Sequence, residues 1–250
     1  MAKFFLMQLA KHLPNFLTLL NLVCGFVAIV LAFNINTLSY APYFLFIAAG
    51  FDFLDGLAAR ILHAYSEIGK QLDSLSDMVS FGVAPGILAF QLLQLSSTAQ
   101  LSAQFFVLSV VIAALIPVFS ACRLGKFNID DRQTTTFYGL PTPASAIFIA
   151  SLVLMVLYYP LSSITQVILN FYVLATVIIL DAILMVVDMP MFSFKIKNLR
   201  LGDNAVQFVF LALSLVLLVL FNFKALPFLV PMYVLLSFVI FAMQKLHTRG

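Results

Sequence analysis

Four aspartates lie in two closely spaced pairs inside strongly apolar sequence. Asp52 and Asp55 are three residues apart, and Asp73 and Asp77 are four residues apart. Residues at these spacings share one face of an α-helix. Hard oxygen ligands such as carboxylates suit Mg²⁺ and Mn²⁺, so the two pairs predict a divalent-cation site. Because Mg²⁺ commonly takes phosphate oxygens beside protein carboxylates, the pattern also indicates a phosphate-bearing substrate.

Small residues and two bases accompany the acids. Gly56 and Ala59 follow on the stripe of the first pair, and Gly69 precedes Asp73 by four residues. Positions with almost no side chain permit the close approach of a helix or a ligand. Burying several carboxylates unaided costs several kcal/mol per group. Arg60 and Lys70 could neutralise two charges, and bound cations would do better.

The composition is that of a membrane protein. The chain has 250 residues, of which 63% are hydrophobic and 9% are charged, whereas soluble domains average about 25% charged residues. Its two cysteines, Cys24 and Cys122, form no disulfide or zinc pattern. The sequence contains no phosphate-binding glycine loop and no nucleic-acid-binding signature, so no nucleic-acid partner is expected.

Uncharged stretches divide the chain into eight predicted transmembrane helices, since about 20 apolar residues cross a bilayer. Breaks occur at 34–37, at 96–98 and around 160–163. The N-terminal residues 1–12 are expected to form a short interfacial amphipathic helix. The predicted spans are residues 13–33, 41–62, 73–95, 101–123, 140–159, 164–187, 204–223 and 226–244.

The basic residues predict the orientation. With eight spans, every lysine and arginine except Lys224 falls on the side of the two termini. Positive charge is retained in the cytoplasm, so both termini and the acidic site are expected to be cytoplasmic. The bases on that side are Lys3, Lys11, Arg60, Lys70, Arg123, Lys126, Arg132, Lys195, Lys197, Arg200, Lys245 and Arg249.

The second and third spans are joined by a short cytoplasmic connection and are therefore expected to be antiparallel neighbours. Counted from Arg60, Asp52 lies ~12 Å into the membrane. Counted from Lys70, Asp77 lies ~10 Å deep. The two pairs thus reach similar depths, and we expect all four carboxylates to meet in one pocket. The alternative, that these acids only pair with bases and helix ends, is disfavoured because intramembrane acids are usually functional.

Longer patterns resemble a known family. The run from Asp52 to Asp77 reads D-x-x-D-G-x-x-A-R, eight residues, then G-x-x-x-D-x-x-x-D, and it resembles the signature of the CDP-alcohol phosphotransferases at every position. Three further blocks are similar to the phosphatidylserine synthase branch, the CDP-diacylglycerol–serine O-phosphatidyltransferases. They are PNFLTLLNLVCGFVAIV at 14–30, GKQLDSLSDMVSFGVAP at 69–85 and CRLGKFNIDDRQTTTFYGLPTPASA at 122–146.

The resemblance implies a fold and a reaction. The expected fold is an all-α membrane protein with a six-helix catalytic core at 13–190, a basic loop and C-terminal two-helix hairpin at 191–250, and a homodimeric assembly. The implied reaction transfers the phosphatidyl group of CDP-diacylglycerol to L-serine, giving phosphatidylserine and CMP. A bacterial cytoplasmic membrane is the expected location.

The resemblance also implies site roles. Asp52, Asp55, Asp73 and Asp77 would hold Mg²⁺ or Mn²⁺ over the pyrophosphate, and Asp77 would double as the general base. The nucleotide and lipid phosphates would lie against five further residues. They are Gly56, Ala59, Arg60, Gly69 and Lys70.

Serine carries a carboxylate, so its pocket needs a fixed cation. Arg123 and Lys126 are the candidates. Alternatively, they bind the lipid phosphate, or they serve only as positively charged anchors on the cytoplasmic side of the membrane. Where the branch usually reads RLARFN, this chain has lysine at 126, which keeps the charge but loses the bidentate fork.

Other interpretations stay open. A different acceptor, glycerol 3-phosphate or inositol phosphate, would favour a denser basic cluster. A cation transporter is less favoured because transport sites tend to lie near the midplane within inverted repeats. Asp181 could complete the pocket, pair with Arg123, lie in a dimer interface or serve helix packing. Asn15 and Thr18 are expected to make helix-packing hydrogen bonds.

Overall fold

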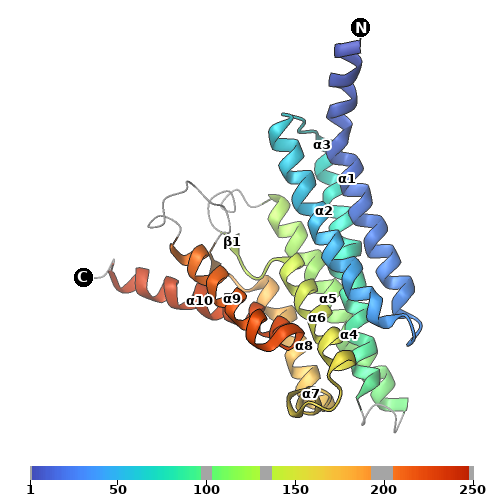
Figure 1. Ribbon diagram of the computed structural model, residues 1–250, viewed down its shortest axis with the longest axis vertical. Coiled ribbons are helices and arrows are strands. Elements are labelled where there is room, and N and C mark those ends of the chain that lie inside the picture. The colour runs from blue at the N-terminus through green and yellow to red at the C-terminus, as the bar shows by residue number, and fades with distance from the viewer. Residues whose placement is uncertain (1, 97–102, 130–136, 193–204, 248–250) are drawn as a thin grey trace.

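The protein is an all-α integral membrane protein (Figure 1). The computed structural model describes residues 2–96, 103–129, 137–192 and 205–247. The predicted loop bases Arg132, Lys195, Lys197 and Arg200 lie outside these ranges, as does Arg249.

Helices α1 (Ala2–Ala32) and α2 (Ala41–Ile61) pack along each other as an antiparallel pair (Figure 1). The predicted break between them is a turn in which the amides of Thr37 and Leu38 donate to the carbonyl of Asn34. Residues 2–12 do not form a separate helix, contrary to the expectation of a short N-terminal element. They continue α1 across Pro14, and the Thr18 hydroxyl approaches the Pro14 carbonyl at 3.0 Å.

The third predicted span begins earlier than expected. Helix α3 (Glu67–Asp77) starts at Ser66, whose side chain caps it by accepting from the amide of Gly69. The helix continues through a π-helical segment η2 (Met78–Val83) into α4 (Ala84–Leu95). Pro85 has no amide hydrogen and would leave a carbonyl one turn earlier without a helical donor. Ser120 donates to the carbonyl of Phe81 from the neighbouring helix, which satisfies a buried backbone group in that region.

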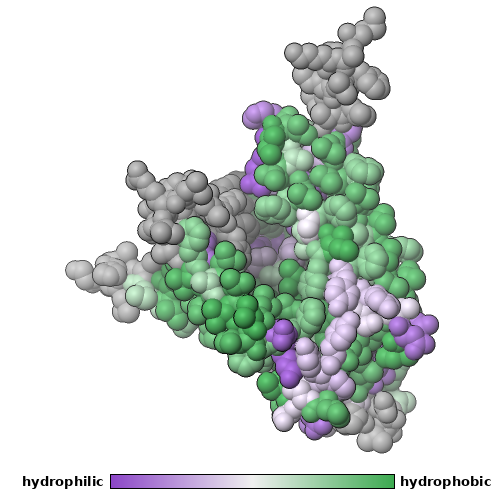
Figure 2. Space-filling model, in the orientation of Figure 1, coloured by the Kyte–Doolittle hydropathy of each residue, from purple (hydrophilic) through white to green (hydrophobic). Residues whose placement is uncertain are grey.

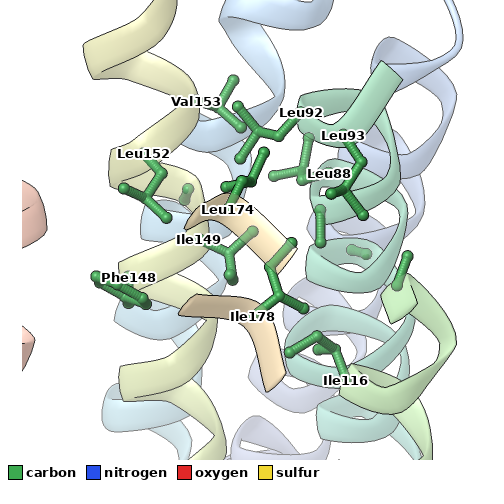
Figure 3. Close-up of a cluster of buried hydrophobic side chains, with 14 of the residues drawn as sticks. Leu88, Leu92, Leu93, Ile116, Phe148, Ile149, Leu152, Val153, Leu174 and Ile178 are labelled. Atoms are coloured by element: carbon green, nitrogen blue, oxygen red, sulfur yellow. The ribbon is translucent and has the colours of Figure 1, made fainter. Parts of the chain in front are cut away.

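A large part of the apolar core lies between four helices, and side chains of α1 and α2 also belong to it. Helix α4 packs with α5 (Ala103–Ile129), α6 (Thr142–Tyr158) and α8 (Phe171–Val186). Leu88 of α4, Ile149 of α6 and Ile178 of α8 point toward one another in the cluster of Figure 3 and are fully buried. A short helix α7 (Ser163–Ile168) precedes α8, so the sixth predicted span is divided at the Asn170 cap.

A two-stranded ladder, which the sequence did not predict, joins the start of α6 to the end of α8. Strand β1 (Phe137–Tyr138) pairs antiparallel with β2 (Pro190–Met191). The amides of Gly139 and Leu140 donate to the carbonyls of Met189 and Leu184 at 2.8 Å each. Gly139 has φ +79°, and a Cβ there would lie 2.5 Å from the Met185 carbonyl oxygen, so this tie requires glycine.

The C-terminal hairpin consists of α9 (Ala205–Phe221), a 3₁₀ turn η6 (Asn222–Ala225) and α10 (Leu226–His247). It lies obliquely against the bundle in Figure 1. Tyr233 of α10 is buried, and its hydroxyl donates to the carbonyl of Phe192 at 2.9 Å. The hairpin is therefore attached to the rest of the protein through the residue that follows β2.

Within the described residues, four helical stretches are long and apolar enough to cross a membrane: His12–Ala32, Glu67–Leu95, Ala103–Ile129 and Val206–Met243. The last stretch contains both hairpin helices, and α6 and α8 are shorter apolar helices. All eight predicted spans are mainly helical, although the sixth is divided between α7 and α8, while the number of crossings stays a prediction. Apolar side chains cover much of the face shown in Figure 2, as expected for a surface in contact with lipid.

Gly25 of α1 lies in close contact with Ser80 of η2 in the acidic half of the protein. A Cβ at Gly25 would lie 2.7 Å from the Cα of Ser80, so backbone would have to move. We predict that Gly25→Ala destabilises the protein by about 1–3 kcal/mol, the usual cost of overpacking. The measurement is the thermal unfolding midpoint in detergent.

Gly50→Ala is the matched control, because Gly50 is exposed on α2 and a Cβ there meets nothing within 4 Å. We expect its unfolding midpoint to stay at or above the wild-type value. Equal midpoints for both variants would contradict the close α1–η2 contact.

Candidate functional site

The acidic site forms where α2 and α3 meet α1. Single ligand oxygens of Asp52, Asp55 and Asp73 lie within 4.8 Å of one another. The structure thus brings together three of the four predicted metal ligands, from two helices. We call these three residues the carboxylate trio.

A divalent cation fits the carboxylate trio. Three carboxylates at this separation repel one another in surroundings poor in water, and a cation removes that repulsion. One oxygen of Asp73, Oδ1, is buried and has no hydrogen-bond partner in the part of the chain that the structure describes. An unpaired buried acceptor calls for an explanation, and a cation bound to that oxygen provides one.

Asp77 has a different environment. It is 8% exposed and does not belong to the carboxylate trio. Its Oδ1 accepts a hydrogen bond from Nδ2 of Asn21 on α1 at 3.1 Å. The fourth predicted ligand is therefore held by an amide, although it lies close enough to Asp52 and Asp73 to interact with them electrostatically.

A cavity of about 500 Å³ opens beside the carboxylate trio, which is within the usual size range of small-molecule sites. Helices α1, α2 and α3 and the connection from α2 to α3 provide its walls. Its lining residues are Pro14, Asn15, Thr18, Asp55, Gly56, Ala59, Ala64, Tyr65, Ser66, Glu67, Gly69, Lys70 and Asp73. Four of the five predicted nucleotide and lipid contacts, namely Gly56, Ala59, Gly69 and Lys70, are among them.

The two cavity glycines serve different purposes. A Cβ at Gly56 would meet nothing within 4 Å, so this position leaves space in the cavity itself. A Cβ at Gly69 would lie 2.9 Å from Oδ1 of Asn15 and from Oγ of Ser66. Gly69 is therefore needed for the close approach of α1 and for the cap of α3.

The remaining basic candidates lie elsewhere. Arg60 is exposed, and its Nε donates to the carbonyl of Gly56 on its own helix at 2.9 Å. Lys126 pairs with Asp188 at 2.5 Å. Arg123 is 4% exposed, with its guanidinium 5.8 Å from the centre of the Phe127 ring. None of these three lines the cavity described above.

Helix α5 nevertheless reaches the site through its last turn. Nζ of Lys70 donates to the carbonyl of Asn128 at 3.2 Å, and the Asn128 amide donates to Oγ of Ser74 at 2.8 Å. Both hydrogen bonds join a residue of α3, Lys70 or Ser74, to Asn128 near the end of α5. The helix that carries Arg123 and Lys126 is thus anchored one turn from Asp73.

The sequence interpretation missed the contribution of α1. Thr18, expected to serve helix packing, donates to Oδ2 of Asp55 at 2.6 Å, and Asn15 lines the cavity. Asn21 was not considered as a site residue. The available signal was the three-residue spacing of Asn15, Thr18 and Asn21, which places polar side chains near one side of an otherwise apolar helix.

Asp181 serves helix packing. Its Oδ2 accepts from the hydroxyl of Ser145 at 2.5 Å, which joins α8 to α6. Asp181 is 4% exposed and is absent from the cavity lining. Of the four roles considered for Asp181, the structure supports the contact between helices.

Comparison with known proteins places the chain among lipid-synthesising transferases. A CDP-diacylglycerol–serine O-phosphatidyltransferase of Bacillus subtilis (strain 168) is 38% identical over 135 residues, covering 53% of this chain and 70% of that protein. An archaetidylserine synthase of Methanothermobacter thermautotrophicus is 34% identical over 156 residues, covering 60% of this chain and 61% of that protein.

A third relative, the CDP-diacylglycerol–serine O-phosphatidyltransferase of Methanocaldococcus jannaschii, is 32% identical over 165 residues. This match covers 66% of the chain and 72% of the relative. The CDP-alcohol phosphatidyltransferase family matches residues 11–192, which run from within α1 to β2 and include every residue of the cavity. With a carboxylate trio, a neighbouring cavity and a family match over most of its length, the chain belongs to the CDP-alcohol phosphatidyltransferase family.

Proposed function

We propose that this protein transfers the phosphatidyl group of CDP-diacylglycerol to L-serine, releasing CMP. The observation that carries the proposal is the carboxylate trio beside a cavity of about 500 Å³, in a chain of this family. The named serine acceptors of two relatives, from Bacillus subtilis and Methanocaldococcus jannaschii, support serine as the acceptor.

The cavity would receive the cytidine nucleotide. Gly56 and Ala59 leave room along α2, and Lys70 supplies a positive charge at the rim. Asp52, Asp55 and Asp73 would hold Mg²⁺ or Mn²⁺. When bound, such a cation neutralises the pyrophosphate oxygens and stabilises the departing CMP.

The acceptor step requires a base. The serine hydroxyl oxygen forms a bond to the lipid-side phosphorus, the bond from that phosphorus to the CMP oxygen breaks, and the hydroxyl proton must leave. Asp77 is the proposed base, because it is buried beside the carboxylate trio without belonging to it and is oriented by Asn21. The proton of the serine hydroxyl goes to the Asp77 carboxylate. CMP leaves with the electrons of the broken phosphorus–oxygen bond.

Arg123 and Lys126 are the proposed cations for the serine carboxylate or the lipid phosphate. Both belong to the helix whose end contacts α3 through Asn128. Lys126 now pairs with Asp188 at the exposed end of α8, so this role requires an exchange of partners. In the proposed orientation, the site and both termini lie on the cytoplasmic side of a bacterial membrane. The proposed assembly is a homodimer.

The acceptor assay tests the proposed function directly. Purified protein with CDP-diacylglycerol and Mn²⁺ is expected to release CMP with L-serine at least about tenfold faster than with glycerol 3-phosphate or inositol phosphate. Adding a chelator should abolish release, and adding Mg²⁺ or Mn²⁺ should restore it. Faster release with a phosphorylated acceptor would assign the chain to another branch of the family.

Replacing Asp77 by Asn tests the base. We expect turnover to fall more than about a hundredfold, because the amide cannot accept the hydroxyl proton, while nucleotide binding is partly retained. Asp181→Asn is the matched control, since it makes the same change in a buried aspartate outside the cavity. Turnover of Asp77→Asn similar to that of the control would remove Asp77 from this role.

Replacing Gly56 by Ala tests the position of the nucleotide. The new methyl group points into open cavity space, so the fold should be unaffected and the thermal unfolding midpoint unchanged. The Michaelis constant for CDP-diacylglycerol is expected to rise about tenfold or more, the usual effect of one misplaced methyl group. An unchanged Michaelis constant would place the nucleotide elsewhere.

A further inference from the structure

Helix α1 donates one side-chain hydrogen bond to each aspartate pair. The Thr18 hydroxyl donates to Asp55 at 2.6 Å, and the Asn21 amide donates to Asp77 at 3.1 Å. Thr18 is 3% exposed and Asn21 is fully buried. Because water does not compete for these two donors, each bond constrains the orientation of a carboxylate.

The Thr18 hydroxyl has one hydrogen and two neighbouring acceptors. Its contact with Asp55 is 2.6 Å, and its contact with the Pro14 carbonyl is 3.0 Å. Hydrogen bonds to a charged acceptor are shorter and about twice as strong as neutral ones. The shorter contact is therefore the one that the hydroxyl hydrogen makes.

Asn21 is itself held in place. Its backbone carbonyl accepts from the Ser80 hydroxyl at 2.9 Å, three residues beyond Asp77 on the same continuous helix. Gly25, one turn further along α1, allows the backbones of α1 and η2 to touch at Ser80. The amide of Asn21 is thus fixed relative to the carboxylate that it contacts.

The two acceptors of these bonds differ in kind. Asp55 belongs to the carboxylate trio, whereas Asp77 does not. Outer hydrogen bonds to metal ligands typically change metal affinity or activity by about 10–100-fold when they are removed. The effects of losing Thr18 and Asn21 should therefore appear in different measurements.

We propose that Thr18 and Asn21 are positioning residues with separate tasks. Thr18 orients Asp55 for cation binding, and Asn21 holds the carboxylate of Asp77 toward the acceptor hydroxyl. The task of Asn21 rests on the proposed function, since it requires Asp77 to act as the base. The task of Thr18 requires only that the carboxylate trio binds a cation.

The experiment compares Thr18→Val with Asn21→Leu, because both changes remove a polar group and keep similar volume. Mn²⁺ binding to the purified protein without substrates is measured by calorimetry, and CMP release with serine is measured at saturating Mn²⁺. For Thr18→Val we expect the dissociation constant for Mn²⁺ to rise about tenfold. For Asn21→Leu we expect kcat to fall about tenfold, with the Mn²⁺ constant and both Michaelis constants within twofold.

Two further variants keep the test sharp. Thr18→Ser keeps the hydroxyl and should restore Mn²⁺ affinity. Ser120→Ala removes a different buried hydrogen bond, to the Phe81 carbonyl, and should lower the unfolding midpoint without altering Mn²⁺ binding or kcat. If Asn21→Leu does not fold, Asn21→Ala removes the same donor and replaces it in the comparison.

A purely structural role would change Mn²⁺ affinity and kcat together in both variants, in proportion to the loss of stability, and that result would overturn the proposal. Unchanged values in both variants would overturn it as well. If the wild-type protein binds Mn²⁺ and Thr18→Val weakens that binding, but no acceptor-dependent CMP release occurs with serine, the proposed function fails and the role of Thr18 stands.

Discussion

The crowding of carboxylates between apolar helices is the constraint on which the rest of this structure depends. Charges in surroundings poor in water cost several kcal/mol each unless cations or hydrogen-bond donors compensate them. The protein brings three carboxylates within reach of one ion and leaves an oxygen of Asp73 without a hydrogen-bond partner among the described residues. The donor set and spacing of such a site suit a divalent cation. In the proposed reaction, that cation would attract the phosphate oxygens of the nucleotide-activated lipid.

Helix packing makes this crowding possible. Gly25 and Gly69 let α1 approach η2 and α3 until side chains meet backbone, so the hydroxyl of Thr18 and the amide of Asn21 reach the acids. A Cβ at Gly25 would meet the backbone of Ser80, and a Cβ at Gly69 would displace the side chains of Asn15 and Ser66. A π-helical segment follows Asp77 directly. Such segments are frequent at functional sites within helices.

The outer helices link the site to the far side of the bundle. The end of α5 contacts α3 through Asn128, and Lys126 joins α5 to the end of α8. The β1–β2 ladder ties α8 to the start of α6, and Tyr233 of α10 holds the residue after β2. The C-terminal hairpin is therefore connected to the helix of Arg123 and Lys126 by a continuous series of contacts.

Much of the fold and the centre of the site could be predicted from the sequence, because both depend on periodicity. Uncharged stretches of the right length predict membrane helices, and spacings of three and four place Asp52 with Asp55 and Asp73 with Asp77 on common faces. The tertiary structure decided three further features. They are the separation of Asp77 from the carboxylate trio, the hydrogen-bond donors on α1 and the position of Arg60 against its own helix. The sequence by itself determined which residues share a helix face and that the buried acids need a cation. Only the packing of three helices decided which carboxylates meet, because contacts between residues 37 and 56 positions apart depend on helix rotation and approach, which local patterns do not specify.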